Sequence, residues 1–539
     1  EPSVPEVVVL PPTGLQTLDE LVFEPEIDRQ HIAAETKKLQ RYYQRLHQQL
    51  QHFTLQHRHV FEASREEIIR IFTLSVTGFD TPGSGASLPE AKTALQTLQD
   101  AYLLYAPMVE AAAPEVNQKL QAAFAQGLSQ LARKDFDDFD RLAFLRQVVN
   151  PLTANLPAAQ HALSIEARSD LQQLPSPINS QAKHLFDNDF LSADFYANLS
   201  PSPNLDKRRA LGELLFFDPV LSNNLTTSCA SCHQPELAFT DGRTRSLGND
   251  GKQTVLRNSP TLINSVYAEK YFHDLREEHL ERQINHVVAD AQEFAIDFVT
   301  IEERLRQSAE YQKLFAEAYA DQPKYQLSKW SVSDAISNYV ASLRSFNSAF
   351  DRYARGEDVV LSEDVRKGFN LFMGKATCGT CHFAPTFSGL VPPNFSESES
   401  EVLGIPADSL WENATIDKDL GRIANRVPRD EAYFHAFSFK TPTVRNAAIT
   451  APYMHNGVYT NLTQVMNFYN KGGGAGIGIE LEHQTLPPAN LQLEAEEIKA
   501  VIAFMEQLTD YEKLYQRPER LPTFAGKPEW NARRIGGNY

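Results

Sequence analysis

The amino-acid sequence predicts a mostly α-helical protein in which an N-terminal helical bundle is followed by two related helical domains in tandem. Over residues 14–174, apolar residues recur at three- and four-residue steps between Pro, Gly or Asp breaks, which is the pattern of amphipathic helices. A series of such helices favours an antiparallel bundle. Further along, Gly212–Phe216 and Gly368–Phe372 are similar runs, and each ends a helix-periodic segment. This self-similarity indicates two copies of one structural unit.

Both copies lead into a run of the form Cys-x-x-Cys-His, and the two runs use all four cysteines of the chain. Their cysteines and histidines are Cys229, Cys232, His233, Cys378, Cys381 and His382. This spacing is the attachment site of c-type haem, in which two thioethers fix the porphyrin and the adjacent histidine lies under the iron. We therefore expect two tandem cytochrome c-like haem domains, each with one covalently bound haem c.

Other uses of paired cysteines fit these runs less well. Zinc sites contain Cys-x-x-Cys units, but two units about 150 residues apart, each followed directly by a histidine, suit a tetrahedral zinc site poorly. A thioredoxin-like redox pair requires a strand-to-helix context, whereas loops that contain Gly and Pro flank these runs. Structural disulfides across so short a spacing are strained.

The chain is too long for one hydrophobic core, and its composition divides it into segments. We expect an N-terminal tether at 1–13, the helical bundle at 14–174, a linker at 175–205, a first haem domain at 206–345, a second haem domain at 346–515 and a C-terminal tail at 516–539. Gly14–Glu20, at the start of the bundle, faintly resembles the signature of imelysin-like helical domains. That signature carries a histidine where this chain has Gln16, so we expect a docking or substrate-presenting module here.

The charge and hydropathy of the chain limit the kinds of partner and the location that we expect. A formal net charge of -18 argues against nucleic acid and favours small neutral substrates or a basic partner. The sequence has no run of about 18 apolar residues that could span a membrane. Because haem c is attached outside the cytoplasm, we expect a periplasmic protein whose leader is absent from the sequence. A lipid anchor upstream of Glu1 would be its route to a membrane.

Several runs beyond His233 carry a family resemblance. They are Leu237–Gly242, Arg257–Asn264, Tyr311–Phe315, Phe350–Tyr353 and Ala451–Gly457. Together they resemble the bacterial dihaem cytochrome c peroxidases and their MauG-type relatives, over about residues 206–510. The resemblance implies that the first haem reduces hydrogen peroxide and that the second haem transfers electrons.

In this family, a glutamine and a glutamate ten residues apart line the open face of the first haem, and Gln283 and Glu293 stand at that spacing. The resemblance makes Glu293 the acid/base and Gln283 the positioning residue. Many members also place a removable histidine over the first iron, but the corresponding loop here, Leu247–Asp250, contains none. Because asparagine and aspartate are poor ligands for haem iron, we expect a five-coordinate or water-bound first haem without prior reduction. His286 or His279 could substitute only if the fold departs from the family.

The resemblance also bears on the second haem. Electron-accepting members place a methionine fourteen residues after the histidine of the Pro-Tyr-x-His motif, and counting from His455 reaches Tyr469. MauG-type enzymes use a tyrosine there, and an anionic oxygen ligand favours oxidised iron. We expect Tyr469 to be the sixth ligand of the second haem, with Met466 or Met454 as the alternative.

Further cofactor contacts follow from the same resemblance. Family members carry a tryptophan between the haems, and here that position is His273, which is harder to oxidise. His273, His455 and Arg445 are expected to be cofactor-binding residues. The family also binds an inter-haem calcium ion through an asparagine oxygen and two backbone carbonyls, and the matching positions are Asn258, Thr450 and Pro452. Carbonyl and amide oxygens are suitable ligands for calcium.

The sequence therefore predicts a dihaem c-type peroxidase in which the second haem relays or stores oxidising equivalents. Electrons would come from a small redox protein or, as in MauG-type enzymes, from a protein substrate that is oxidised. The alternative is a dihaem electron-transfer cytochrome without physiological peroxidase activity. The optical response of the oxidised protein to hydrogen peroxide separates the two.

Overall fold

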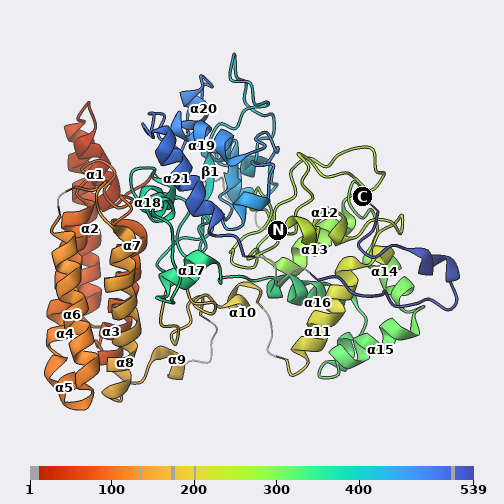
Figure 1. The fold of residues 1–539 in the computed structure, drawn as a ribbon, viewed down its shortest axis with the longest axis horizontal. Helices are drawn as coiled ribbons and strands as arrows, with labels where there is room; N and C mark the ends of the chain where they lie inside the picture. Colours follow the sequence, from red (N-terminus) through yellow and green to blue (C-terminus); the bar gives the residue numbers. More distant parts are fainter. Residues whose placement is uncertain (1–10, 134, 172–175, 199–201, 511–515, 539) are drawn as a thin grey trace. The chain divides into compact units, whose positions relative to one another are not determined.

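The computed structural model describes residues 11–133, 135–171, 176–198, 202–510 and 516–538 (Figure 1). The chain forms two compact units, each assembled from segments that are distant in sequence. The first unit contains 1–190, 349–396 and 494–504, and the second contains 191–348, 397–493 and 505–539. The expectation of a mostly helical protein is confirmed. The domain limits drawn from the sequence stay predictions, and most of the expected tether lies outside the described residues.

The N-terminal helices of the first unit are α1 (Leu15–Phe23), α2 (Arg29–Gln51), α3 (His57–Arg70), α4 (Ser87–Leu103), α5 (Ala106–Ala112), α6 (Pro114–Leu131), α7 (Arg141–Phe144), α8 (Asn150–Ala162) and α9 (Arg168–Leu171). Two π-helical turns, η1 (Ile71–Ser75) and η2 (Leu145–Val149), continue α3 and join α7 to α8. Helix α4 packs on α6, and both α3 and α6 pack on α8. These helices run alongside one another as long columns (Figure 1). Leu95, Leu120, Phe124 and Leu152 are buried between them.

The rest of the first unit contains α17 (Ala349–Ala354), α18 (Glu363–Phe372), the 3-10 turn η6 (Cys378–Thr380) and most of α21 (Ala495–Glu506). The second Cys-x-x-Cys-His run begins at η6. The N-terminal helices contact this part directly. The Asn370 amide of α18 accepts a hydrogen bond from the Leu142 backbone N–H and donates one to Asp140, both at 3.1 Å. The rings of Phe79 and Phe383 meet edge to face, with centroids 5.7 Å apart. The N-terminal helices therefore cover one side of the second attachment segment.

The second unit carries the first Cys-x-x-Cys-His run. Its helices are α10 (Ala193–Tyr196), α11 (Leu205–Phe217), α12 (Cys229–Cys232), α13 (Leu280–Ala289), α14 (Phe298–Leu305), α15 (Ala309–Ala318), α16 (Lys329–Ser342), α19 (Leu462–Asn470) and α20 (Gly473–Gly476). The described residues contain one sheet, an antiparallel pair of β1 (Ser400–Val402) and β2 (Ser438–Lys440), in which Ser400 lies opposite Lys440. Among these residues no helix is both long and apolar enough to cross a bilayer.

The two similar glycine-containing runs occupy equivalent places in their helix pairs. Helix α11 crosses α16 so closely that a Cβ on Gly212 would lie 1.9 Å from the Ala335 carbonyl oxygen. In the same way, a Cβ on Gly368 of α18 would lie 1.9 Å from the Ala500 carbonyl oxygen of α21. Only glycine permits backbones to approach this closely. The internal similarity in the sequence therefore corresponds to a shared way of packing one helix across another.

We expect Gly212→Ala and Gly368→Ala each to destabilise the protein by about 3 kcal/mol, because the added methyl group would displace a helix backbone rather than a flexible side chain. Thermal unfolding followed by circular dichroism measures the effect. Gly526→Ala is the matched control, since no atom of the described residues lies within 4 Å of the position that its methyl group would take. Unchanged melting temperatures for both crossing variants would show that these helices can separate without cost.

Candidate active site

The first Cys-x-x-Cys-His run forms a single helical turn that is fixed at both ends. The Ser228 N–H donates to the Ser231 hydroxyl at 3.0 Å, which caps the start of α12. The His233 N–H donates to the Cys229 carbonyl at 3.0 Å, which closes its end. Because the two cysteines lie one turn apart, their side chains share one side of the helix. This arrangement presents two thiols and an imidazole as a preformed group.

The His233 imidazole is oriented by two partners. Its Nδ1 lies 3.0 Å from the Phe239 carbonyl oxygen and 3.2 Å from the Ser259 hydroxyl. Since a carbonyl oxygen only accepts, Nδ1 must carry the proton, and Nε2 is then the nitrogen with a lone pair. Burial lowers the pKa of His233, which keeps the ring neutral. The histidine is thus in the tautomer that ligates a metal through Nε2.

The surroundings of this run suit a large apolar cofactor. Cys229 packs against an apolar cluster that includes Phe216, Phe239 and Tyr339, and burial raises the pKa of its thiol to about 12. None of the four cysteines of the chain is in a disulfide, and all four are half-buried. Cysteines in an apolar pocket beside a neutral histidine are the groups that hold haem c. The residues present therefore fit the cofactor that the motif predicts.

Glu293 lies near this cysteine turn. It follows α13 in a turn closed by the hydrogen bond from its N–H to the Asp290 carbonyl at 3.2 Å. Burial, followed by the charge of Asp290, raises the pKa of its carboxyl to about 7. The Glu293 charge in turn raises the pKa of Cys229, which places the carboxylate within electrostatic reach of the attachment site. A carboxyl with a pKa near 7 can both accept and donate a proton at neutral pH.

The histidine-free loop Leu247–Asp250 supports the segment that carries Glu293. The Asn249 N–H donates to the Gln292 carbonyl at 2.8 Å, and the Asn249 side chain donates to the Ala291 carbonyl at 3.1 Å. The Asp250 carboxylate accepts from the backbone N–H groups of its own loop, at Lys252 and Gln253. The polar side chains of this loop therefore form hydrogen bonds with backbone groups.

The other candidates near α13 occupy different settings. Gln283 is half-buried on this helix, ten residues before Glu293. The His286 imidazole pairs with Glu277 at 3.1 Å and meets the Phe272 ring edge to face. His286 is therefore engaged in a surface contact, and the sequence alternative that made it an iron ligand gains no support from this geometry.

His273 is held in a buried hydrogen-bonded position. Its Nε2 donates to the Asn258 carbonyl at 3.1 Å, and its own carbonyl accepts from the Lys440 N–H at 2.7 Å. Burial, followed by the charges of Arg257 and His455, lowers its pKa to about 4. The ring is therefore neutral at physiological pH.

His455 lies on the same network. Its ring stacks on Phe439 with centroids 3.7 Å apart, and its Nε2 lies 3.4 Å from the Asp417 carboxylate. This hydrogen bond is the main reason that the pKa of Asp417 lies well below its usual range. The Nδ1 of His455 is buried and has no hydrogen-bond partner among the residues that the structure describes. A group bound at this site would supply the missing partner.

Arg257 ties this region together. Its guanidinium contacts Asp419 at 2.6 and 3.0 Å and Asp274 at 2.6 Å. The three side chains are no more than 13% exposed. Arg445, which the family resemblance makes a cofactor-binding residue, is 1% exposed, and its guanidinium lies 4.3 Å from the centre of the Phe346 ring. Both arginines thus place a cation in the interior of the second unit.

The three expected calcium ligands lie on two connected segments. The Asn258 N–H donates to the His455 carbonyl at 2.7 Å, which brings Asn258 to the segment that contains Thr450 and Pro452. The Asn258 side-chain N–H group donates to the Arg243 carbonyl at 2.6 Å, and this turns the amide oxygen away from that carbonyl. A donor set of amide and carbonyl oxygens fits calcium by its chemistry.

The second Cys-x-x-Cys-His run is built in the same manner within the first unit. The His382 Nδ1 lies 3.2 Å from the Phe387 carbonyl oxygen, which sets the same tautomer as in His233. Burial raises the pKa of the Cys378 thiol to about 12. Around the run lie the aromatic rings of Phe350, Phe369, Phe372, Phe387 and Phe504, each in contact with at least two of the others. This aromatic pocket also fits haem.

The candidate sixth ligands belong to the second unit. Tyr469 is half-buried near the end of α19 and contacts Phe468 edge to face, with centroids 5.9 Å apart. Met466 is 3% exposed, and Met454 packs on the apolar cluster of Ile405 and Phe468. Met466 is thus a core side chain, whereas Met454 and Tyr469 each keep part of their surface accessible.

Two supporting residues have no role in the sequence prediction. The Ser259 hydroxyl donates to the Cys232 carbonyl at 2.8 Å and lies 3.2 Å from His233 Nδ1, so it links the cysteine turn to the imidazole. The sequence could have indicated the role of Ser259 through its place in the matched run Arg257–Asn264, directly before a proline. It could not have indicated the supporting role of Asn249, because hydrogen bonds between loops leave no spacing pattern in the sequence.

Comparison with known proteins agrees with this geometry. Residues 206–359 match the family described as Di-haem cytochrome c peroxidase. The cytochrome-c peroxidase IdrP2 of Denitromonas iodatirespirans is 33% identical over 59% of this chain and 87% of its own length. The methylamine utilization protein MauG of Methylorubrum extorquens is 30% identical over 57% of this chain and 79% of its own length.

Among solved structures, a MauG-like protein associated with microbial copper homeostasis is 27% identical, with a TM-score of 0.50. The match covers 64% of this chain and 95% of that one. The family implies two c-type haems, in agreement with the two attachment runs and their histidines. The chain therefore belongs to the dihaem cytochrome c peroxidase and MauG family and is an oxidoreductase of that type.

Proposed function

We propose that this protein reduces hydrogen peroxide at the first haem and that the second haem relays or stores the oxidising equivalents. The observation that carries the proposal is the setting of Glu293, a carboxyl with a pKa of about 7 within electrostatic reach of Cys229. The histidine-free loop at Leu247–Asp250 also supports the proposal, since the side chains of Asn249 and Asp250 form hydrogen bonds with backbone groups.

Each residue has a role in this proposal. Haem c, when bound, supplies an iron that accepts peroxide and takes up oxidising equivalents. His233, fixed by Phe239 and Ser259, would hold the iron of the first haem. Glu293 would take a proton from the bound peroxide and return it to the oxygen that leaves as water, while Gln283 would position the substrate by donating a hydrogen bond.

The test is to add one equivalent of hydrogen peroxide to the fully oxidised holoprotein and to record the haem spectrum by stopped flow. We expect a fast change in the Soret band, followed by turnover when a reduced small cytochrome is supplied. A spectrum that does not respond to peroxide would leave the electron-transfer cytochrome as the better account. A spectral change without steady turnover would favour the oxidation of a protein substrate, the second possibility that the MauG relatives raise.

Tyr469 is proposed as the sixth ligand of the second haem. We expect Tyr469→Met to raise the reduction potential of one haem, because a thioether stabilises reduced iron relative to an anionic oxygen ligand. A spectroelectrochemical titration measures the potentials of both haems. Tyr433→Met is the control, since that side chain is 60% exposed on a surface turn. Identical potentials in Tyr469→Met and the parent protein would remove Tyr469 from the ligand set.

The periplasm is the proposed location, because covalent haem attachment takes place there in bacteria.

We also propose a calcium ion at Asn258, Thr450 and Pro452, where the donors are the amide oxygen and two carbonyls. Removing calcium with a chelator should slow electron transfer between the haems, and re-addition should restore it. A chelated protein with unchanged turnover and no bound calcium by elemental analysis would contradict this.

A further inference from the structure

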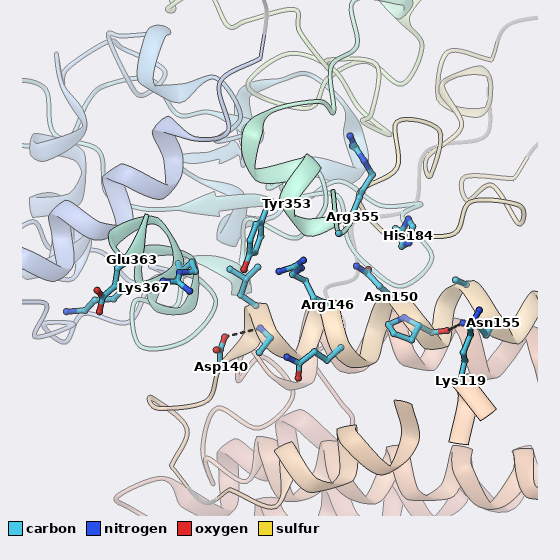
Figure 2. A pocket seen from close by; sticks show the side chains of 17 residues that line it. Lys119, Asp140, Arg146, Asn150, Asn155, His184, Tyr353, Arg355, Glu363 and Lys367 are labelled. Carbon is cyan, nitrogen blue, oxygen red and sulfur yellow. Dashed lines mark hydrogen bonds between the residues drawn. The ribbon is translucent and has the colours of Figure 1, made fainter. Parts of the chain in front are cut away.

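A cationic groove lies within the first unit and is lined by none of the thiol-run residues (Figure 2). It has a volume of about 900 Å³ and is bounded by α6, the η2–α8 helix, α17 and α18. Its lining includes the cations Lys119, Arg146, Arg355, Arg366 and Lys367 and only two carboxylates. A local excess of positive charge is unusual on a chain whose formal net charge is -18.

The two carboxylates of the groove are directed elsewhere or lie at its edge. Asp140 accepts from the Ala143 N–H at 2.9 Å and from Asn370 at 3.1 Å. Glu363 is exposed in the first turn of α18. Lys119, Arg146 and Arg366 have no carboxylate in an ion pair with them in the part of the chain that the structure describes. Arg355 pairs with Glu357 at 2.7 Å, so the charge of Lys119, Arg146 and Arg366 is what remains without an ion-pair partner.

The centre of the groove is a built site. The Arg146 guanidinium stacks on the Tyr353 ring, 4.1 Å from its centroid, which fixes its position and leaves its edge available for hydrogen bonds. Figure 2 shows Arg146 and Tyr353 facing each other, with Asn150 beside them on the same helix as Arg146. Arg146 lies in the π-helical turn η2, which is closed by the hydrogen bond from the Asn150 N–H to the Leu145 carbonyl. Such turns occur frequently at functional sites.

Asn150 supplies the observation that identifies the ligand chemistry. Its side chain is 6% exposed, and its Nδ2 donates to the Ala354 carbonyl at 2.6 Å. Because that carbonyl can only accept, the amide orientation is fixed, and Oδ1 is the side-chain atom that this contact leaves without a donor. This Oδ1 is buried and has no hydrogen-bond donor among the described residues. A buried acceptor of this kind requires a donor, and the ligand is the group that can provide one.

We propose that this groove binds a small hydroxylated polycarboxylate. One carboxylate would pair with the edge of Arg146, for which the bidentate geometry of guanidinium and carboxylate is suited. The hydroxyl would donate to Asn150 Oδ1, and the remaining carboxylates would lie in the field of Lys119 and Arg366. A single unpartnered acceptor among cationic side chains favours a compact ligand with one hydroxyl over an acidic peptide. The volume lies within the range of small-molecule sites, roughly 300–1,000 Å³.

The test is calorimetric titration of the full-length holoprotein with citrate and with tricarballylate, which has the same three carboxylates and lacks the hydroxyl. We expect saturable binding of one citrate, roughly five- to tenfold weaker binding of tricarballylate because Asn150 Oδ1 stays unsatisfied, and weaker binding of both at higher salt. Arg146→Gln should weaken citrate binding by about tenfold or more. Arg45→Gln, an exposed charge on α2 outside the groove, is the matched control.

Three results would overturn the proposal. A hexaglutamate peptide is titrated in the same way as citrate, and tighter binding of the peptide would identify an acidic protein segment as the occupant. Equal affinities for citrate and tricarballylate would remove Asn150 from recognition. Absence of saturable heat with citrate, in a protein whose peroxide response is intact, would show that the groove binds no such anion. The haem spectrum and the melting temperature check that the protein is intact in each titration, so the first two results do not depend on the peroxidase proposal.

Discussion

Glu293→Gln is expected to slow the reaction with hydrogen peroxide by roughly 10²- to 10⁴-fold, the usual contribution of a positioned acid/base. Glutamine keeps the size of the side chain but cannot take up a proton. Stopped-flow measurement of the rate at which the haem spectrum responds to peroxide tests this directly. Glu303→Gln removes an equal charge from an exposed position on α14 and should leave the rate unchanged. Equal rates in Glu293→Gln and the parent would exclude Glu293 from the mechanism.

The pH dependence follows from the raised pKa of Glu293. Burial and the charge of Asp290 raise this pKa to about 7, so the carboxyl is protonated below that pH and ionised above it. Because the base form is needed to take the proton from peroxide, the rate should rise with pH through about 7 and then level. Asp290→Asn should move the midpoint to lower pH, since one cause of the raised pKa is removed. A midpoint that does not move would show that another group titrates.

Arg257→Leu is expected to have the largest effect on stability, a loss of about 3–5 kcal/mol, because it leaves Asp274 and Asp419 buried without this counter-charge. Chemical denaturation of the holoprotein, followed by circular dichroism, measures the loss. The control is Arg429→Leu, which breaks the ion pair with Glu278 on an exposed surface and should cost less than about 1 kcal/mol. Similar losses in both variants would show that burial does not determine how much the Arg257 ion pairs contribute to the free energy of unfolding.

The same network predicts how stability changes with acid. Burial acts to raise the pKa of Asp419, and the hydrogen bond and charge of Arg257 outweigh it, so that the folded-state pKa is lowered. Its contribution to stability is therefore complete at neutral pH and is lost as the pH falls through the folded-state value. In Arg257→Leu the pKa is no longer lowered by the guanidinium, so acid unfolding should begin at higher pH. An unchanged acid transition would contradict this assignment.

The sequence was sufficient to predict the helical fold class, the two thiol runs and the family, because each depends on local spacing. The similarity of Gly212–Phe216 to Gly368–Phe372 also indicated a repeated unit, and the structure gives its physical reason in two close helix crossings. The position of Glu293 relative to Gln283 followed from family spacing. The raised pKa of Glu293 did not, because it depends on burial and on the neighbouring Asp290.

Other features depend on long-range contacts, which the spacing of residues along the sequence does not reveal. The N-terminal helices pack on the segment of the second thiol run, through Asn370 and the rings of Phe79 and Phe383, although hundreds of residues separate these positions. The cationic groove arises from the same packing, since Arg146 and Tyr353 come from distant parts of the chain. Composition alone, with an acidic net charge, pointed away from a cationic site.

The central claim is that the first haem, held by His233, keeps a position open to peroxide beside Glu293. Low-temperature electron paramagnetic resonance of the fully oxidised protein tests it most directly. The account predicts a high-spin ferric signal from one haem that disappears when hydrogen peroxide is added. Two low-spin signals that are unchanged by peroxide would show that both irons are closed by protein ligands and would contradict it.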